Sequence, residues 1–166
     1  TDLHQGHSHV VRAVPADSLD LGDWLTPTRP AEVDLDADRR GDQVTLRGQV
    51  RVVGDRDCGR CATSVPVELE AEVVGLADRR GSDSPEDEAA LEQEGSVLYH
   101  DGIELNLAEP LREALILEVP VVTLCRPDCA GLCPQCGQDK NTAACTCTAS
   151  EGDPRWDALK KLKDGS

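Results

Sequence analysis

The stretch QVTLRGQVRVVGDRDCGRC, residues 43–61, decides the fold, because an alternating segment runs directly into a pair of cysteines. Apolar side chains occupy one face, at Val44, Leu46, Val50 and Val52. Such alternation predicts a β-strand with one buried face. Gly48 falls on the apolar face, where a bulge or a close neighbour would explain it. Cys58 and Cys61 then lie in the turn that follows the strand.

Two further segments beside this one alternate in the same way. They are AEVDLDA (residues 31–37) and SVPVELEAEVV (residues 64–74). Three successive strands of this kind predict an antiparallel meander with one wet face. VLYHDGIELNL (residues 97–107) predicts a strand or a hairpin around Asp101 and Gly102. Residues 77–96 are rich in acids and have no apolar period, so we expect a disordered acidic loop there.

The sequence indicates one packed helix and one terminal helix. Pro110 suits the first turn of a helix near residues 109–118, and Pro120 ends it. Apolar residues at helical spacing, among them Leu111 and Leu115, predict that this helix packs on the sheet. A short C-terminal helix is expected from about Asp153. The predicted class is α+β: an antiparallel β-meander or barrel-like sheet with one packed helix, a Cys-rich zinc-binding region and this short helix.

These elements suggest three segments along the 166 residues. Residues 1–30 are polar and weakly patterned, so we expect a flexible N-terminal segment. The histidines of HQGHSH (His4, His7 and His9) are then expected to belong to a tail and not to a metal site. Residues 31–124 form the predicted β-rich core, and residues 125–166 the Cys-rich zinc-knuckle region with the C-terminal helix.

The composition predicts a thin core and an acidic surface. The chain has no Phe and no Met, so its core must be built from Leu, Val and Ala. Additional cross-links would help such a core. The formal net charge is −15, which argues against non-specific binding to nucleic acid and favours basic partners.

The sequence also sets an expected compartment. No stretch approaches 18 apolar residues, so no membrane partner is expected. The first residues lack a basic segment followed by an apolar run, so we expect no signal peptide and a cytoplasmic location. In a reducing compartment, clustered cysteines indicate metal binding or catalysis more than disulfides.

The eight cysteines admit four interpretations. A disulfide framework suits secreted chains, and a redox pair would need only two thiols. An iron–sulfur cluster takes four thiolates, but these spacings match neither ferredoxin pattern. Zinc fits best, because CPQCG (residues 133–137) has the form of a zinc knuckle and all-thiolate zinc sites are structural.

Eight thiols divide into two sites of four, which predicts two Zn²⁺ ions. The preferred pairing places Cys58, Cys61, Cys125 and Cys129 around the first ion. The second ion would then take Cys133, Cys136, Cys145 and Cys147. A rival pairing joins the 58/61 pair to the 133/136 pair as a zinc ribbon.

No catalytic motif is evident, so we expect no enzyme. A hydrolytic zinc keeps an open position and usually involves His or a carboxylate. His100 is the only histidine beyond the first nine residues. The sequence carries no phosphate-binding loop and no serine nucleophile motif, and no small-molecule substrate is evident.

Several strings together resemble one family. They are CGRC (58–61) after a strand, EPLREALILEVPVVTLCRPDCAGLCPQCG (109–137), the distal CTC (145–147) and DPRWDALKKL (153–162). The chain resembles the bacterial YceD proteins, also known as domain-of-unknown-function family 177, in an actinobacterial form. The resemblance runs from about Arg47 to Leu162. It implies a role in the accumulation of large-subunit ribosomal RNA, with no enzymatic activity.

Three functional hypotheses follow. The first is a non-enzymatic, zinc-stabilised factor of large-subunit assembly that binds a ribosomal protein, precursor rRNA or both. The alternatives are a zinc-thiolate redox sensor and a zinc-dependent RNA-processing enzyme. An RNA or partner surface could include Arg47, Arg51, Arg56 and Arg60, although a solvated strand face is the simpler interpretation of these arginines.

Overall fold

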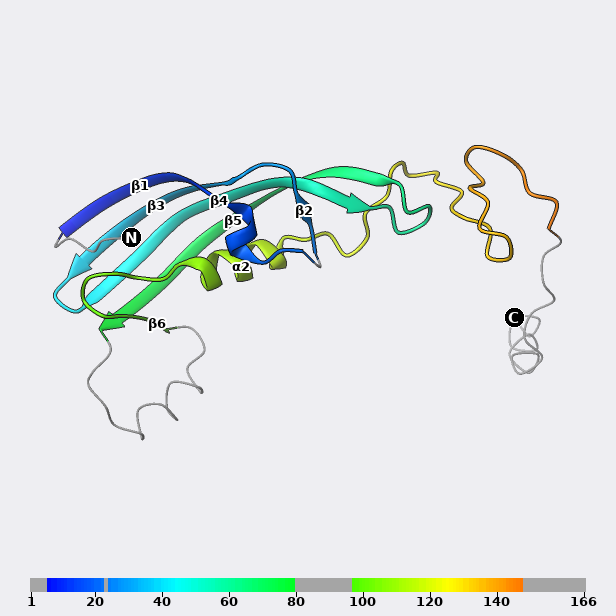
Figure 1. Ribbon diagram of the computed structural model, residues 1–166. Coiled ribbons are helices and arrows are strands. Elements are labelled where there is room, and N and C mark those ends of the chain that lie inside the picture. Colours follow the sequence, from blue (N-terminus) through cyan, green and yellow to red (C-terminus); the bar gives the residue numbers. More distant parts are fainter. Residues whose placement is uncertain (1–5, 23, 80–96, 148–166) are drawn as a thin grey trace, which may run out of the picture.

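A single twisted sheet forms the body of the molecule (Figure 1). The computed structural model describes residues 6–22, 24–79 and 97–147. The strands are β1 Gly6–Val14, β2 Thr26–Pro27, β3 Ala31–Arg40, β4 Gln43–Asp57, β5 Ser64–Arg79 and β6 Val97–His100. A 3-10 helix, η1 (Ala16–Leu19), and one α-helix, α2 (Ala108–Leu117), complete the described elements. The sheet order is β1-β3-β4-β5-β6, and β2 pairs with β4.

The central meander is the one that alternation predicts. Strands β3, β4 and β5 pair antiparallel, with Val50 opposite Val33 on one side and Ala71 on the other. Gly48 faces Leu35 across the ladder. A Cβ atom on Gly48 would lie 2.1 Å from the backbone oxygen of Asp34, so the expected close neighbour is present. Only a glycine permits this approach of β3 to β4.

The sheet is open within the described residues, so the expected barrel-like closure is not confirmed. Strand β1 pairs with β3 at one edge, and β6 pairs with β5 at the other. The β5–β6 pair is parallel, with Leu76 opposite Val97. A parallel neighbour requires a crossover connection, so the meander does not continue as a simple hairpin into β6.

The expectation of a flexible segment over residues 1–30 is wrong for most of its length. Residues Gly6–Val14 form β1, which pairs with β3 from Gly6–Arg39 to Val14–Ala31. Leu19 at the end of η1 is buried, and so are Leu21 and Leu25 after it. An edge strand keeps much of its surface in water, so its sequence needs no clear apolar alternation. Residues 1–5 lie outside the described part.

Helix α2 covers one face of the sheet, as expected (Figure 1). Leu111 and Leu115 are buried against a core that includes Val33, Val50 and Leu69. Each fully buried Leu contributes about 1.5–3 kcal/mol relative to an exposed one. The leucines after η1 join the same core, which is aliphatic because the chain has no Phe.

Two predictions concern the remaining segments. The expected acidic loop at 77–96 begins too early, because β5 extends to Arg79 and Ala77 is fully buried. Residues 80–96 and the expected C-terminal helix lie outside the described residues. Among the helices that are described, none has the length and apolarity needed to cross a membrane.

Candidate metal centres

The first cysteine cluster is built on the turn between β4 and β5. The backbone N–H of Cys58 donates to the carbonyl of Thr63 at 2.9 Å, and that of Ala62 donates to the carbonyl of Cys58 at 2.9 Å. Ala62 has a positive φ of 56°. This left-handed residue folds the turn back on itself, so that Cys58 and Cys61 can present their sulfurs on one side.

The segment after α2 is held against this turn by several hydrogen bonds. The Gly59 N–H donates to the Thr123 carbonyl at 2.8 Å. Arg56 donates to the Pro120 carbonyl at 2.5 Å and to Thr123 Oγ1 at 2.9 Å. Arg60 donates to the Cys129 carbonyl at 2.9 Å. These contacts bring Cys125 and Cys129 to the end of the β4–β5 hairpin.

The four sulfurs of this cluster have the spacing of a metal site. Cys58, Cys61, Cys125 and Cys129 each offer a Sγ atom, and all four atoms lie within 4.8 Å of one another. The Cys61–Cys125 separation is 3.6 Å and the Cys58–Cys129 separation is 3.9 Å. Two thiolates on a tetrahedral zinc with Zn–S bonds of ~2.3 Å lie roughly 3.8 Å apart. The donor set therefore fits zinc in both chemistry and size.

The surroundings prepare one thiol of this cluster for ionisation. The N–H groups of Cys125 and Arg60 donate to the sulfur of Cys58 and lower its pKa to about 6. Removal of its sulfur from water within the cluster, together with the neighbouring sulfur of Cys61, raises the pKa of Cys125 to about 12 although the residue as a whole is exposed. Thiolates so close together repel one another, so ionisation of all four needs a cation among them.

The second cluster is local and repeats the same turn. Cys133, Cys136, Cys145 and Cys147 also lie with their sulfurs within 4.8 Å of one another. The Gly137 N–H donates to the Cys133 carbonyl at 2.9 Å, and Gly137 has a φ of 73°. Gly137 thus takes the position that Ala62 holds in the first turn. The N–H groups of Cys136 and Gln135 lower the pKa of Cys133 to about 6.

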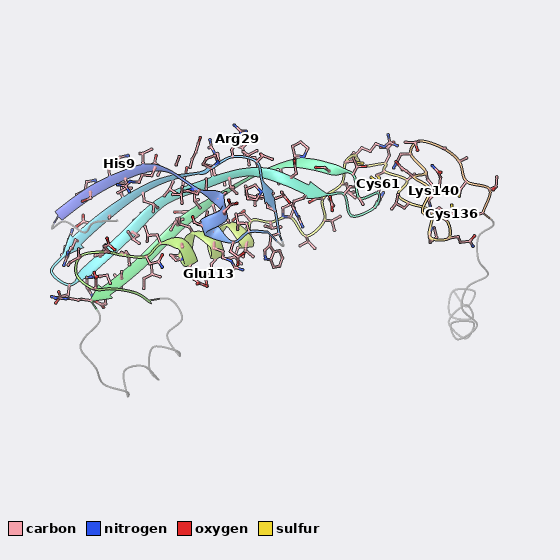
Figure 2. All side chains as sticks on the ribbon, viewed as in Figure 1. His9, Arg29, Cys61, Glu113, Cys136 and Lys140 are labelled. Atoms are coloured by element: carbon pink, nitrogen blue, oxygen red, sulfur yellow. The ribbon has the colours of Figure 1, made fainter. Side chains whose placement is uncertain are left out.

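Among the described residues, the thiols form the two groups of the preferred pairing. The 58/61 and 133/136 pairs of the rival zinc ribbon do not come together. The two clusters differ in exposure. In the first, Cys58, Cys61 and Cys129 are buried and Cys125 is exposed. In the second, only Cys133 is buried. Figure 2 shows Cys61 at the end of the sheet and Cys136 beyond it.

Asn141 connects the two clusters, although no sequence motif singles it out. Its Nδ2 group donates to Cys129 Sγ at 3.4 Å and to Asp139 Oδ1 at 2.6 Å. Its Oδ1 atom accepts from the Ala130 N–H at 2.8 Å and from Arg126 at 2.7 Å. Burial on its own would raise the pKa of Cys129. Hydrogen bonds to its sulfur outweigh burial, so the pKa is lowered, and the bond from the Asn141 side chain is the largest of these contributions. Asn141 lies in the second cluster's loop and supports a ligand of the first.

The four arginines suggested as a partner surface do not form one stripe. Arg51 donates to Glu70 at 2.9 Å and lies 3.4 Å from Glu68. Arg56 and Arg60 hold the segment of Cys125 and Cys129, as described above. Arg47 lies opposite Asp36 on β3. The outer face around Arg47 and Arg51 carries many acids, namely Glu32, Asp34, Asp36, Asp38, Glu68, Glu70 and Glu72.

His100 is the one histidine within the predicted core, and its ring has backbone hydrogen-bond partners. It is buried, and its Nε2 atom lies 2.7 Å from the carbonyl oxygen of Asp42. The Gly102 N–H donates to its Nδ1 atom at 2.9 Å. Both ring nitrogens therefore have backbone partners that fix the turn after β6.

Two surfaces have the shape or composition to contact a partner. A groove of about 690 Å³ lies between the β1–β3 edge and the segment that enters α2. Val10, Val33 and Leu35 line it, with Asp101 and Glu104 also among its residues. The second surface is apolar: Leu117, Val121 and Val122 are 84%, 98% and 64% exposed between α2 and the first cluster.

Comparison with known proteins gives the family. Residues 46–163 match the family model described as large ribosomal RNA subunit accumulation protein YceD. The chain belongs to the YceD family. The YceD match begins within β4 and includes both cysteine clusters, whereas β1, β2 and β3 precede it.

Relatives come from bacteria and plants. An uncharacterized protein of Mycobacterium tuberculosis is 31% identical over 138 residues, covering 79% of this chain and 61% of the relative. The chloroplastic YCED homolog 1 of Arabidopsis thaliana, named a large ribosomal RNA subunit accumulation protein, is 26% identical over 168 residues (87% and 52%). Its Zea mays counterpart is 29% identical over 147 residues (73% and 50%). The chain spans about half to three fifths of the length of these relatives. No solved structure matches it.

Proposed function

We propose that this protein is a non-enzymatic, zinc-stabilised factor for the accumulation of large-subunit ribosomal RNA, acting in the cytoplasm during ribosome assembly. The YceD match over residues 46–163 carries the proposal. Both thiol groups of the described residues are complete sets of four, which is the donor set of a structural zinc site.

Zinc has a structural role in this proposal. Cys58, Cys61, Cys125 and Cys129 would hold one ion and fix the segment after α2 to the β4–β5 hairpin. The distal four cysteines would hold a second ion and order their own loop. Sites with four thiolates leave no open position for a water nucleophile, which disfavours the alternative of a zinc-dependent RNA-processing enzyme.

The direct partner that fits best is a basic ribosomal protein. The net charge of −15 repels RNA phosphates and attracts cationic surfaces. Acids dominate the outer face of β3 and β5, and Arg51 is already paired with Glu70. Precursor rRNA remains the second candidate partner, and Arg47 is the residue that best tests it.

A crosslinked pull-down from cells tests the proposal. We expect enrichment of one or more large-subunit ribosomal proteins together with large-subunit precursor RNA. Reversing the acidic face with Glu68→Lys and Glu72→Lys should reduce the protein crosslinks, whereas Arg47→Glu should leave them unchanged. If Arg47→Glu instead abolishes RNA crosslinks and the lysine variant has no effect, the direct contact is with RNA.

The Cys58→Ser/Cys61→Ser double variant serves as the control for zinc. It should lose the zinc ion of the first centre. It should also lose the partner, because the β4–β5 hairpin and the segment after α2 would no longer be fixed to one another. If the native protein enriches neither ribosomal proteins nor precursor RNA above a mock pull-down, the assembly function is wrong.

A zinc-thiolate redox sensor is a second candidate, favoured by the exposure of Cys136 and Cys147. Accessible thiolates oxidise first, and oxidised cysteines release metal. Zinc content and circular dichroism before and after mild peroxide decide between the two functions. Retained zinc with an unchanged spectrum eliminates the sensor.

A further inference from the structure

Strand β1 forms an edge of the sheet and, among the described residues, pairs on one side only. Its register with β3 runs without a bulge from Gly6–Arg39 to Val14–Ala31. The backbone groups of an edge strand that point away from its neighbour can pair with a further strand. Proteins usually protect long edges with proline, lysine or a bulge, and β1 (GHSHVVRAV) contains no proline and no lysine. The edge is therefore suited to an additional strand.

The groove described above lies along the inner side of this edge. Val10 and Val14 of β1 are half-buried and point to the same side as the buried residues of β3. With Val33 and Leu35 they form the apolar floor of the groove of about 690 Å³. Successive side chains of a strand point to opposite faces of a sheet. Every second side chain of a strand added beside β1 would therefore point into the groove.

Carboxylates lie on both faces beside the β1 edge. On the inner side, the exposed Asp101 and Glu104 are part of the groove lining, in which Arg12 is the one lysine or arginine. The N–H groups of Glu104 and Ile103 donate to Asp101 Oδ1 at 2.7 Å each and lower the pKa of Asp101, so it stays ionised at neutral pH. On the outer face, the exposed Asp34 of β3 lies opposite β1.

These charges select the occupant of the edge. A second copy of the chain would bring a net charge of −15 and would be repelled. The acid-rich residues 83–94 of the chain itself fit poorly for the same reason. A cationic segment would be attracted, and the apolar floor of the groove requires that some of its side chains be apolar.

We propose that the β1 edge and its groove bind an extended segment of a basic protein, which pairs with β1 as an additional strand and places apolar side chains in the groove. This inference rests on the proposed function, because it names the surface that would hold the basic partner. In this mode of recognition, main-chain hydrogen bonds supply affinity and pockets for alternate side chains supply specificity. The remainder of such a partner would lie on the acidic outer face, which continues from β3 to β1.

The position of the edge separates it from the metal centres. Figure 2 places His9 of β1 at the opposite end of the molecule from Cys61 and Cys136. Strand β1 also precedes residues 46–163, which match the YceD family model. Binding at the edge should therefore not depend directly on the cysteine clusters.

Titration with a synthetic peptide tests the proposal on the whole chain at physiological salt. The probe is a fluorescent peptide of alternating valine and lysine with the length of β1, and a peptide of alternating glycine and lysine is the control of equal charge. We expect the valine peptide alone to bind and to slow amide exchange in β1. N-methylation of one alternate set of its amides should weaken binding by at least about tenfold, and that of the other set by less, because an edge strand pairs along one side.

Substitutions on either wall of the groove locate the site. Val10→Arg should weaken binding of the valine peptide by at least about tenfold, because it places a cation in the groove. Val11→Arg makes the same change on the opposite face of β1 and should have a smaller effect. Glu104→Lys should also weaken binding, and Glu113→Lys on α2, outside the groove lining, is its matched control. Circular dichroism establishes that each variant is folded.

Several results would overturn the proposal. They are equal binding of the glycine peptide, equal effects of the two N-methylated peptides, and binding that both Val10→Arg and Glu104→Lys leave unchanged. Amide exchange in β1 that is already slow and does not respond to the valine peptide would show that the chain itself or a second copy occupies the edge.

The crosslinked pull-down separates this inference from the proposed function. If the native protein and Glu104→Lys enrich the same ribosomal proteins to the same extent, the docking edge is wrong and the assembly function stands. If the native protein enriches neither ribosomal proteins nor precursor RNA, the assembly function itself is wrong, whatever the peptide does.

Discussion

The two cysteine clusters contain the same turn in different settings. Each begins with Cys-x-x-Cys, and in each the next residue has a positive φ and donates its N–H to the first cysteine's carbonyl. The first cluster joins positions 64 and 71 residues apart and is mostly buried. The second closes within 15 residues and is mostly exposed.

The same local turn can therefore stabilise either a contact between distant segments or a single loop. In the first cluster the turn is one half of a tertiary contact, and Arg56, Arg60 and Gly59 add hydrogen bonds around it. In the second cluster the four cysteines order their own loop, whose described contact with the first centre runs through Asn141. We therefore expect the loss of one centre to affect the whole molecule and the loss of the other to remain local.

The largest effect is expected from Cys129→Ser. It removes a buried ligand of the first centre. The three thiolates that remain should bind the ion weakly. Structural zinc contributes on the order of 10 kcal/mol to folding in peptide systems. Thermal unfolding should move to far lower temperature, and mass spectrometry under native conditions should show one zinc ion in place of two.

Cys136→Ser should produce a smaller and more local change. The second ion should be lost, while amide exchange in β4 and β5 stays as slow as in the native protein, because the aliphatic core of the sheet does not involve this loop. Equal loss of protection in β4 and β5 would show that the two centres form one cooperative unit, and the comparison above would fail.

Asn141→Ala tests the contact between the centres. Its loss removes the hydrogen bond to Cys129 Sγ and the support of the Ala130 N–H. Groups that support metal ligands in this way typically change metal affinity by about 10–100-fold. Competition with a zinc chelator should show the weaker binding at the first centre, and Thr142→Ala on the neighbouring residue should show little change.

The smallest effects concern the residue after each Cys-x-x-Cys. Gly137→Ala should destabilise the second loop by about 1 kcal/mol, since an L side chain is disfavoured at a φ of 73° although no atom lies within 4 Å of the new Cβ. Ala62→Gly should be neutral or stabilising by less than about 1 kcal/mol. Denaturant unfolding measures both, and a marked loss in Ala62→Gly would contradict this account.

Sequence patterns correctly predicted the elements that have one buried face and one face exposed to water. Val44, Leu46 and Val50 alternate so clearly that β4 could be predicted, and Pro110 with Pro120 delimits α2 well. Spacing also favoured the observed grouping of cysteines. The presence of zinc itself, and the role of the protein in ribosomal RNA accumulation, stay predictions that the experiments above address.

Other features could not be read from the chain. Strand β1 was missed because His7, Ser8 and Arg12 interrupt any alternation, and only pairing with β3 makes the segment regular. The parallel pairing of β6 depends on a crossover, which periodicity does not encode. Asn141 and Arg60 were missed as partners of Cys129, because side-chain contacts over long separations leave no local pattern.

The long closure of the first centre also orders events during synthesis. The β4–β5 hairpin and its two cysteines leave the ribosome first, and Cys125 follows Cys61 only after 64 residues. Until then the hairpin end holds half of a metal site. Chains elongate at about 5–20 residues per second, so several seconds pass between the synthesis of Cys61 and that of Cys125. The four distal cysteines are synthesised within a much shorter time of one another. Binding of a metal ion by the first cluster would therefore be a late step, after the β-rich core has been synthesised.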